Sequence, residues 1–297
     1  MLDSPPVRVG FVTQLLFERY GTFWRDVVAG AGATVVLPTR EGVQAHAEVV
    51  DPELAPGLWF RLTAVQAASL AACDLLIVPE LNPEEDEVRG SAQDRWVADL
   101  AGALEDAVAG LPPLVSVAAY PDPGIESRAV GLLQSLLHDA AAVKRVWARH
   151  RAEAGKLSRS TSARTAHSVV EKSALPTQAL VGQPWAVTDA VMRAATAAGL
   201  TGLSQRALDA QRAREEGWSY DARLIPTDAE VIGAARILSR RAGVSSLRFL
   251  FDGEAGSDTW LARRVSQAVH KPVDVLPWSD VAAAGDGLGV FLNLPVD

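Results

Sequence analysis

The stretch VRVGFVTQLLFERYGTFWRDVVAGAGATVVL, residues 7–37, decides the fold class. It has a β-branched run at 7–12, an amphipathic stretch at 17–31 that ends at Gly32, and a second apolar run at 34–37. A strand, a helix and a strand in this order are typical of a βαβ unit with parallel strands. The stretch therefore predicts the start of an α/β lobe in which helices flank a parallel sheet.

The same alternation continues along the rest of the chain. Further strands are expected at 75–79, 114–119, 178–182, 200–204, 247–251 and 273–276. Helices are expected around 64–71, 91–109, 127–156, 228–241 and 258–269, with one more that ends near 198. The ending GLGVFLNLPV, residues 287–296, predicts one more strand. No short internal repeat is present, but the two halves share one βα rhythm.

The length of 297 residues exceeds what one hydrophobic core usually supports. We therefore expect an α/β protein with two Rossmann-like lobes, each a parallel sheet flanked by helices. The N-terminal lobe is assigned to 1–150 and the C-terminal lobe to 177–297. A basic, Ser/Thr-rich connection at 151–176 joins them.

Composition excludes several classes of protein. Cys73 is the sole cysteine, so one chain has no disulfide framework, four-cysteine zinc site or self-contained cysteine-ligated iron–sulfur cluster. Its position at the start of an apolar strand predicts a structural thiol. No window offers about 18 uninterrupted apolar residues, and the first ten residues lack a basic region followed by an apolar stretch. We expect a cytoplasmic protein without a membrane partner.

The net charge of −8 argues against a general nucleic-acid binder. One segment, Lys144–Lys172, departs from this trend, with eight Lys or Arg and two Glu residues. Such a segment predicts either a solvated linker or a surface for protein or nucleic acid.

Ligands of parallel sheets bind outside the carboxyl ends of the strands. Four segments are expected there: 13–25, 80–90, 182–189 and 252–259. These segments supply the candidate site residues.

The first candidate group is Tyr20, Trp24 and Arg25. Tyr20 and Trp24 are four residues apart, so on a helix they share a face and could wall a flat pocket while Arg25 holds an anion. The alternative is that both aromatic side chains belong to the core and the arginine is solvated.

The second group lies in GQPWAVTD, residues 182–189, and comprises Gly182, Gln183, Trp185 and Asp189. These residues precede an expected helix, whose N-terminal N–H groups attract anions. The alternative is simple capping of that helix.

The third group, Gly256, Ser257 and Asp258, lies in the segment DGEAGSDTW. Its glycines allow close backbone approach, and Asp252, Glu254 and Asp258 are candidates for acid/base chemistry or, less simply, for metal binding. The alternative is again helix capping. The chain lacks GxSxG, GxxxxGK[ST] and GxGxxG motifs, so acyl-enzyme and common nucleotide sites have no sequence support.

Three of these segments match, in order, three motifs of one family. The run FERYGTFWRD is similar to a family run Tyr-Glu-x-x-Pro-Phe-Trp, GQPWAVTD is similar to Gly-His-Pro-Tyr-Asn-x-x-Asp, and AGSDT is similar to Cys-Gly-Pro-Asp-Ser. The matching residues are Phe23, Trp24, Arg25, Gly182, Pro184, Asp189, Gly256 and Asp258, whereas Gln183, Trp185 and Ala186 depart. By these motifs the chain resembles 2-hydroxyacyl-CoA dehydratase subunits and the related domain of activase-fused proteins.

The chain departs from the family at the positions of the cluster cysteines, and this changes the activity that the resemblance implies. Family members hold a [4Fe–4S] cluster through cysteines at positions that correspond here to Ala55 and Ala255. Alanine has no lone pair to donate to iron, so we expect no cluster cofactor and no dehydratase activity. The resemblance still implies two lobes with a ligand cleft, and it leaves a homo- or hetero-oligomer open because relatives have several subunits.

These observations give three functional hypotheses. The first is a non-cluster relative that binds a small anionic or CoA-like molecule in the cleft between its lobes. The second is an enzyme with redox-independent acid/base chemistry. The third is an interaction module for protein or nucleic acid that uses Lys144–Lys172.

Overall fold

The computed structural model describes residues 5–82, 90–120, 124–154 and 177–294. These residues form two compact units. The described part of the first unit comprises 5–82, 99–120, 124–154 and 293–294, and that of the second comprises 90–98 and 177–292. Of the expected connection at 151–176, only 151–154 falls within the described residues.

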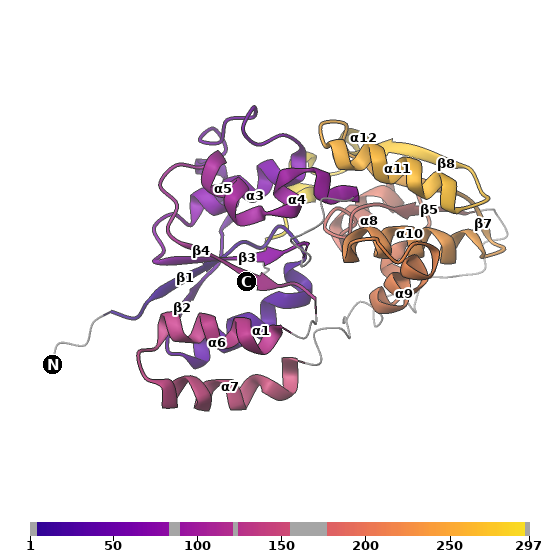
Figure 1. Cartoon of the computed structure of the whole chain (residues 1–297). Coiled ribbons are helices and arrows are strands. Elements are labelled where there is room, and N and C mark those ends of the chain that lie inside the picture. Colours follow the sequence, from indigo (N-terminus) through magenta and orange to yellow (C-terminus); the bar gives the residue numbers. More distant parts are fainter. Residues whose placement is uncertain (1–4, 83–89, 121–123, 155–176, 295–297) are drawn as a thin grey trace. The chain divides into compact units, whose positions relative to one another are not determined.

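The first unit is built on a parallel sheet with the strand order β2-β1-β3-β4. Its strands are β1 (Arg8–Phe11), β2 (Thr34–Val36), β3 (Leu75–Glu80) and β4 (Leu114–Ala118). The sheet is flanked by α1 (Phe17–Gly30), α2 (Arg40–Ala45), α3 (Leu58–Ser69), α5 (Leu100–Ala107), α6 (Ile125–Leu136) and α7 (Ala140–Ala154). Figure 1 shows α1, α6 and α7 on one side of this sheet and α3 and α5 on the other.

The second unit repeats this topology. Its sheet has the order β6-β5-β7-β8, from β5 (Thr177–Val181), β6 (Leu203–Ser204), β7 (Val244–Phe251) and β8 (Val273–Pro277), and all its pairs are parallel. In both sheets the first strand of the unit lies between the second and third. The predicted α/β class with two Rossmann-like lobes is therefore confirmed.

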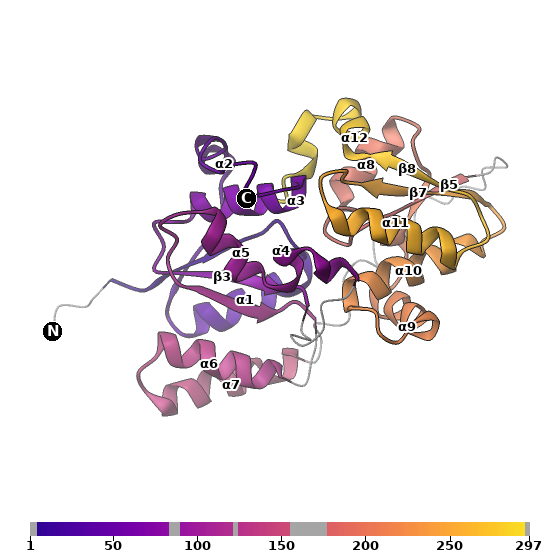
Figure 2. The same cartoon turned by 45° about the horizontal axis from the view of Figure 1, so that its top comes forward.

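Helices pack on the second sheet in two groups. The helices α8 (Asp189–Ala197) and α12 (Trp278–Ala284) contact each other, while α10 (Pro226–Ser239) contacts α9 (Ala210–Tyr220) and α11 (Gly256–Ala268) (Figure 2). Short 3₁₀ segments are η1 (Gly90–Gln93), η3 (Gln205–Ala207) and η4 (Gly287–Phe291). The short helix α4 (Arg95–Ala98) follows η1 and belongs to the same unit.

Three expectations from the sequence are wrong. The helix expected at 127–156 is divided into α6 and α7, with residues 137–139 between them. The helix expected at 91–109 is divided into η1, α4 and α5, because Asp99 interrupts it and caps α5 by accepting a 3.0 Å hydrogen bond from the N–H of Gly102. The strand expected at 287–296 is replaced by η4 within the described residues. Gly287 has a φ of 52°, which a strand does not accommodate.

The sequence pattern also missed α9, because the segment AQRAREEGWSY has few apolar residues. Glycines allow α9 to pack closely on α10. A Cβ atom at Gly217 would overlap the carbonyl of Ala229, and one at Gly233 would overlap the carbonyl of Ala213. This contact holds α10 in the core, with its first turn at the carboxyl edge of the second sheet.

None of the helices in the described ranges combines the length and the apolar character that crossing a membrane requires.

Candidate functional site in the second unit

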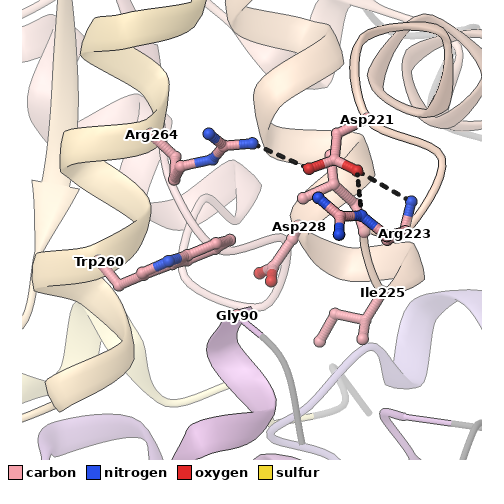
Figure 3. A pocket seen from close by; sticks show the side chains of 8 residues that line it. Gly90, Asp221, Arg223, Ile225, Asp228, Trp260 and Arg264 are labelled. Carbon is pink, nitrogen blue, oxygen red and sulfur yellow. Dashed lines mark hydrogen bonds and ion pairs between the residues drawn. The ribbon is translucent and has the colours of Figure 1, made fainter. Parts of the chain in front are cut away.

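A pocket of about 280 Å³ opens where the α9–α10 connection, α11 and η1 meet. It is lined by Gly90, Asp221, Arg223, Leu224, Ile225, Asp228, Trp260 and Arg264 (Figure 3). All eight residues belong to the second unit, although Gly90 precedes the others by more than a hundred positions. The pocket combines four charged side chains with an indole ring and two aliphatic side chains.

Asp228 is the buried acid of this pocket. It lies in the first turn of α10 and is fully buried. Its Oδ2 accepts a 2.9 Å hydrogen bond from the N–H of Ser91, and its Oδ1 accepts a 2.5 Å bond from the Ser91 hydroxyl. Burial raises the pKa of the Asp228 carboxyl to about 6, although the hydrogen bonds from Ser91 and Gln183 oppose this rise.

Further acids lie behind Asp228. Asp258 is buried in the first turn of α11, and its Oδ2 accepts a 2.8 Å hydrogen bond from the N–H of Asp252. Burial raises the pKa of the Asp258 carboxyl well above its ordinary value, and the charges of Asp252, Asp94 and Asp228 add to this rise. Asp94 accepts a 3.0 Å hydrogen bond from the N–H of Ser257. The raised pKa favours the protonated form of Asp258, because its charge would otherwise be buried near other carboxylates.

The basic side chains of the pocket share one partner. Asp221 bonds Arg264 at 3.0 Å through Nη2 and the exposed Arg223 at 3.4 Å through Nε. These hydrogen bonds hold the pKa of Asp221 below its usual range, the largest effect being the one from the backbone N–H of Arg223. The Arg264 guanidinium also lies 6.0 Å from the centre of the Trp260 ring. Its Nε is buried and has no hydrogen-bond partner within the described residues.

Gly90 forms part of the pocket wall because it has no side chain. Its φ of 57° lies in the left-handed region, which glycine adopts without strain. A Cβ atom there would overlap Oδ2 of Asp228 and crowd the Trp260 ring. The residues 83–89 that precede it, which include most of the candidate segment 80–90, lie outside the described residues.

The segment 182–189 supports the pocket from behind. The amide of Gln183 donates a 2.8 Å hydrogen bond to the Ser91 hydroxyl, while its Oε1 is buried without a partner in the described part of the chain. Trp185 is buried against Trp96, with 5.4 Å between ring centroids. The N–H of Gly182 donates to Oε1 of Gln205.

The remaining residue of this group, Asp189, lies on the surface. Its carboxylate forms an ion pair with Arg206 at 2.9 Å. Thr188 is the N-cap of α8, and its hydroxyl accepts a hydrogen bond from the N–H of Val191. For Thr188 the capping alternative describes the structure.

The candidates of the N-terminal segment occupy core positions of the first unit. Tyr20 is fully buried and donates a 2.9 Å hydrogen bond to the carbonyl of Val12, and Trp24 donates a 3.1 Å bond from Nε1 to the carbonyl of Ala118. Arg25 is exposed. The arrangement matches the alternative of core aromatic side chains beside a solvated arginine.

In the third candidate group, Ser257 and Asp258 are buried, whereas Gly256 and Glu254 are exposed. Asp252 and Asp258 are linked by their hydrogen bond but do not line the pocket. None of the ten candidate residues lines the pocket. Two of them interact with the Asp228 carboxyl: Gln183 forms a hydrogen bond with it, and the charge of Asp228 helps to raise the pKa of Asp258.

The positions that resemble cluster ligands do not fit an iron–sulfur cluster. Ala55 and Ala255 are both buried and offer only a methyl group. Cys73 is buried two residues before β3, and burial raises the pKa of its thiol, which disfavours the thiolate that iron binds. Among the described residues, no group of three or more His, Cys, Asp or Glu side chains is placed to hold a metal ion.

Sequence reasoning missed most of the pocket. One signal was available, since Trp260 and Arg264 are four residues apart on the helix expected at 258–269 and therefore share a face. No local signal identifies Asp228, because an acid in a first helical turn is usually an ordinary favourable interaction with the helix dipole.

Neither protein-family models nor curated proteins give a match to this chain. The fold defines a protein with two Rossmann-like lobes.

Proposed function

We propose that this chain binds a small anionic ligand in the pocket of the second unit, as a relative of the 2-hydroxyacyl-CoA dehydratases without their cluster chemistry. The observation that carries the proposal is Arg264. Its guanidinium lines the pocket, and its buried Nε–H lacks an acceptor within the described residues.

An anion would supply the missing acceptor. A buried donor without a partner costs about 1–3 kcal/mol, and a bound carboxylate or phosphate recovers this loss. The planar guanidinium suits such groups because its N–H donors match the geometry of paired oxygens. Asp221 holds the guanidinium in place through Nη2.

Size restricts the ligand further. Pockets that enclose drug-sized ligands span roughly 300–1,000 Å³, and this one has about 280 Å³. The proposal therefore favours a small carboxylate or phosphate ester over an entire coenzyme A molecule. Leu224, Ile225 and Trp260 provide apolar surface for the rest of such a ligand.

The test is calorimetric titration with acetate, 4-methylpentanoate, inorganic phosphate and acetyl-CoA. We expect one of the small anions to bind, and the variant Arg264→Gln to lose at least about tenfold in affinity. Arg263→Gln is the matched control, because Arg263 is exposed on the same helix. Absence of binding by every anion, or equal binding by Arg264→Gln and wild type, would contradict the proposal.

A second candidate function is acid/base catalysis, and Asp228 is the observation that favours it. A carboxyl group with a pKa near 6 at a pocket wall can exchange protons near neutral pH. The residues first considered for this role are Asp252, Glu254 and Asp258, and none of them lines the pocket. The test is turnover of any ligand that binds: catalysis should disappear in Asp228→Asn while binding of the anion persists.

The interaction hypothesis for Lys144–Lys172 stays a prediction, since 155–172 lies outside the described residues. In the described part, on α7, Arg145 pairs with Asp139 and Arg151 with Glu126. Its test is binding to nucleic acid that weakens steeply with salt.

A further inference from the structure

We infer that the pocket ligand carries a cationic nitrogen as well as its anion, as a small zwitterion of the α-amino acid type does. The inference rests on the proposed function and names the ligand class. Arg264 and Trp260 lie side by side on α11, and Asp228, in the first turn of α10, lies next to the Trp260 ring (Figure 3).

The charges of the pocket are unevenly paired. Asp221 already bonds both arginines, Arg223 and Arg264. Asp228 accepts hydrogen bonds from Ser91 and from the amide of Gln183. Among the described residues, no Lys, Arg or His side chain forms an ion pair with it. A buried carboxylate without a cation is costly, so a ligand ammonium would be strongly favoured beside it.

The surface next to Asp228 also suits an ammonium group. Oδ2 of Asp228 and the Trp260 ring both approach the point where a Gly90 side chain would begin. A carboxylate beside an indole ring attracts a cation by charge and by the ring quadrupole. Gly90 packs directly against Oδ2 of Asp228, and Asp228 is a lining residue of the pocket although its side chain is fully buried from solvent.

The pH dependence separates a zwitterion from a simple anion. Around Asp228, the titratable or charged groups are Asp221, Arg223 and Arg264 in the pocket and Asp94, Asp252 and Asp258 behind it. Asp228 gains its charge as pH rises through about 6. A ligand with an ammonium should then bind more tightly, whereas a carboxylate without one should bind more weakly.

The experiment compares leucine, 4-methylpentanoate and 3-methylbutylamine by calorimetry at about pH 5.5 and about pH 7.5. The three probes share a branched chain and differ in charge. At the higher pH we expect leucine to bind at least about tenfold more tightly than 4-methylpentanoate. We also expect opposite pH trends for these two ligands, a result that needs no variant.

Asp228→Asn should abolish the preference for leucine, since the amide keeps one acceptor for the Ser91 N–H but carries no charge. Asp274→Asn is the control, because Asp274 is exposed on β8 of the same unit. Equal affinities for leucine and 4-methylpentanoate at the higher pH, or a preference that survives in Asp228→Asn, would overturn the zwitterion while leaving anion binding intact. Absence of binding by both leucine and 4-methylpentanoate would overturn the inference, and lack of binding by all the small anions would remove the proposed function as well.

Discussion

Ser91 donates two hydrogen bonds to the carboxylate of Asp228, one from its N–H to Oδ2 at 2.9 Å and one from its hydroxyl to Oδ1 at 2.5 Å. The two residues are 137 positions apart in the sequence, and both are fully buried. The pair joins η1 to the first turn of α10 within the second unit. These two hydrogen bonds therefore hold the Asp228 carboxylate in position at the pocket.

Replacing Ser91 with Ala should lower the free energy of unfolding by about 2–3 kcal/mol. The change leaves Oδ1 of Asp228 and the amide of Gln183 buried without the shared hydroxyl. Chemical denaturation measures the loss. Ser239→Ala is the control, because that partly buried hydroxyl donates only to a carbonyl of its own helix, and it should change stability by less than about 0.5 kcal/mol. Equal effects of the two changes would contradict the role of Ser91.

Stability should fall as pH rises through the range in which Asp228 ionises. Its pKa is about 6 in the folded state and about 3.9 in an unfolded chain, so its contribution is fully present below about pH 4 and is lost by about pH 7. The loss is about 3 kcal/mol relative to Asp228→Asn. The Asp228 charge also adds to the raised pKa of Asp258, so the pH-dependent difference between the two proteins includes this coupling to Asp258. Denaturation curves with the same pH slope for both proteins would be incompatible with a raised pKa.

Gly90→Ala should destabilise the second unit by about 2–3 kcal/mol and close the pocket. The new methyl group would overlap the Asp228 carboxylate and crowd Trp260, and the φ of 57° would add strain. Gly287→Ala is the control, since Gly287 has a φ of 52° but nothing within 4 Å of its Cβ position. It should cost only about 1 kcal/mol. Thermal unfolding of the two variants measures the difference, which would vanish if the overlap were unimportant.

The ion pair between Arg214 and Glu230 should be costly to break from one side. It is buried between α9 and α10, with an N–O distance of 3.1 Å and side chains 4% and 5% exposed. Glu230→Leu should lower the free energy of unfolding by about 3–5 kcal/mol, because it leaves a buried guanidinium without its counter-charge.

The double variant Arg214→Met/Glu230→Leu is the discriminating measurement. It should recover most of that loss, since no buried charge remains. Arg145→Met serves as the control at an exposed pair and should change stability by less than about 1 kcal/mol. A double variant as unstable as Glu230→Leu would show that the leucine itself disrupts the packing.

Cys73 should react slowly with iodoacetamide while the protein is folded. Burial raises the pKa of its thiol, with a smaller opposing effect from Arg8, and the side chain packs near Gly10. Both effects reduce the thiolate available for attack, so we expect a rate about 100-fold below that in denaturant. Mass spectrometry of timed samples measures the rate. Comparable rates in both conditions would show that Cys73 is accessible.

Much of the fold follows from local patterns. The run at 7–37 gives β1, α1 and β2 within one or two residues of the predicted bounds, because β-branched runs and apolar periodicity act over short distances. The same reasoning failed at Asp99 and Gly287. Asp99 interrupts a helical stretch, and Gly287, with a φ of 52°, begins a 3₁₀ segment where the apolar pattern predicts a strand.

Local sequence patterns predicted much less of the candidate site than of the fold. Tyr20 and Trp24 share a helix face as predicted, yet that face packs into the core, and periodicity does not distinguish a core from a binding wall. Trp260 and Arg264 could have been paired from their spacing. Gly90 and Asp228 could not, since no local feature brings two segments so distant in sequence to one place.

The sequence by itself determined the two α/β lobes and the absence of metal-donor atoms at Ala55 and Ala255, because secondary structure and ligand chemistry depend on residue type and short spacing. Only the tertiary structure decided that residues 90–98 belong to the second unit and that Ser91 meets Asp228 there. The physical reason is burial: a carboxyl group acquires a raised pKa, and a pocket acquires its walls, only when distant segments exclude water together.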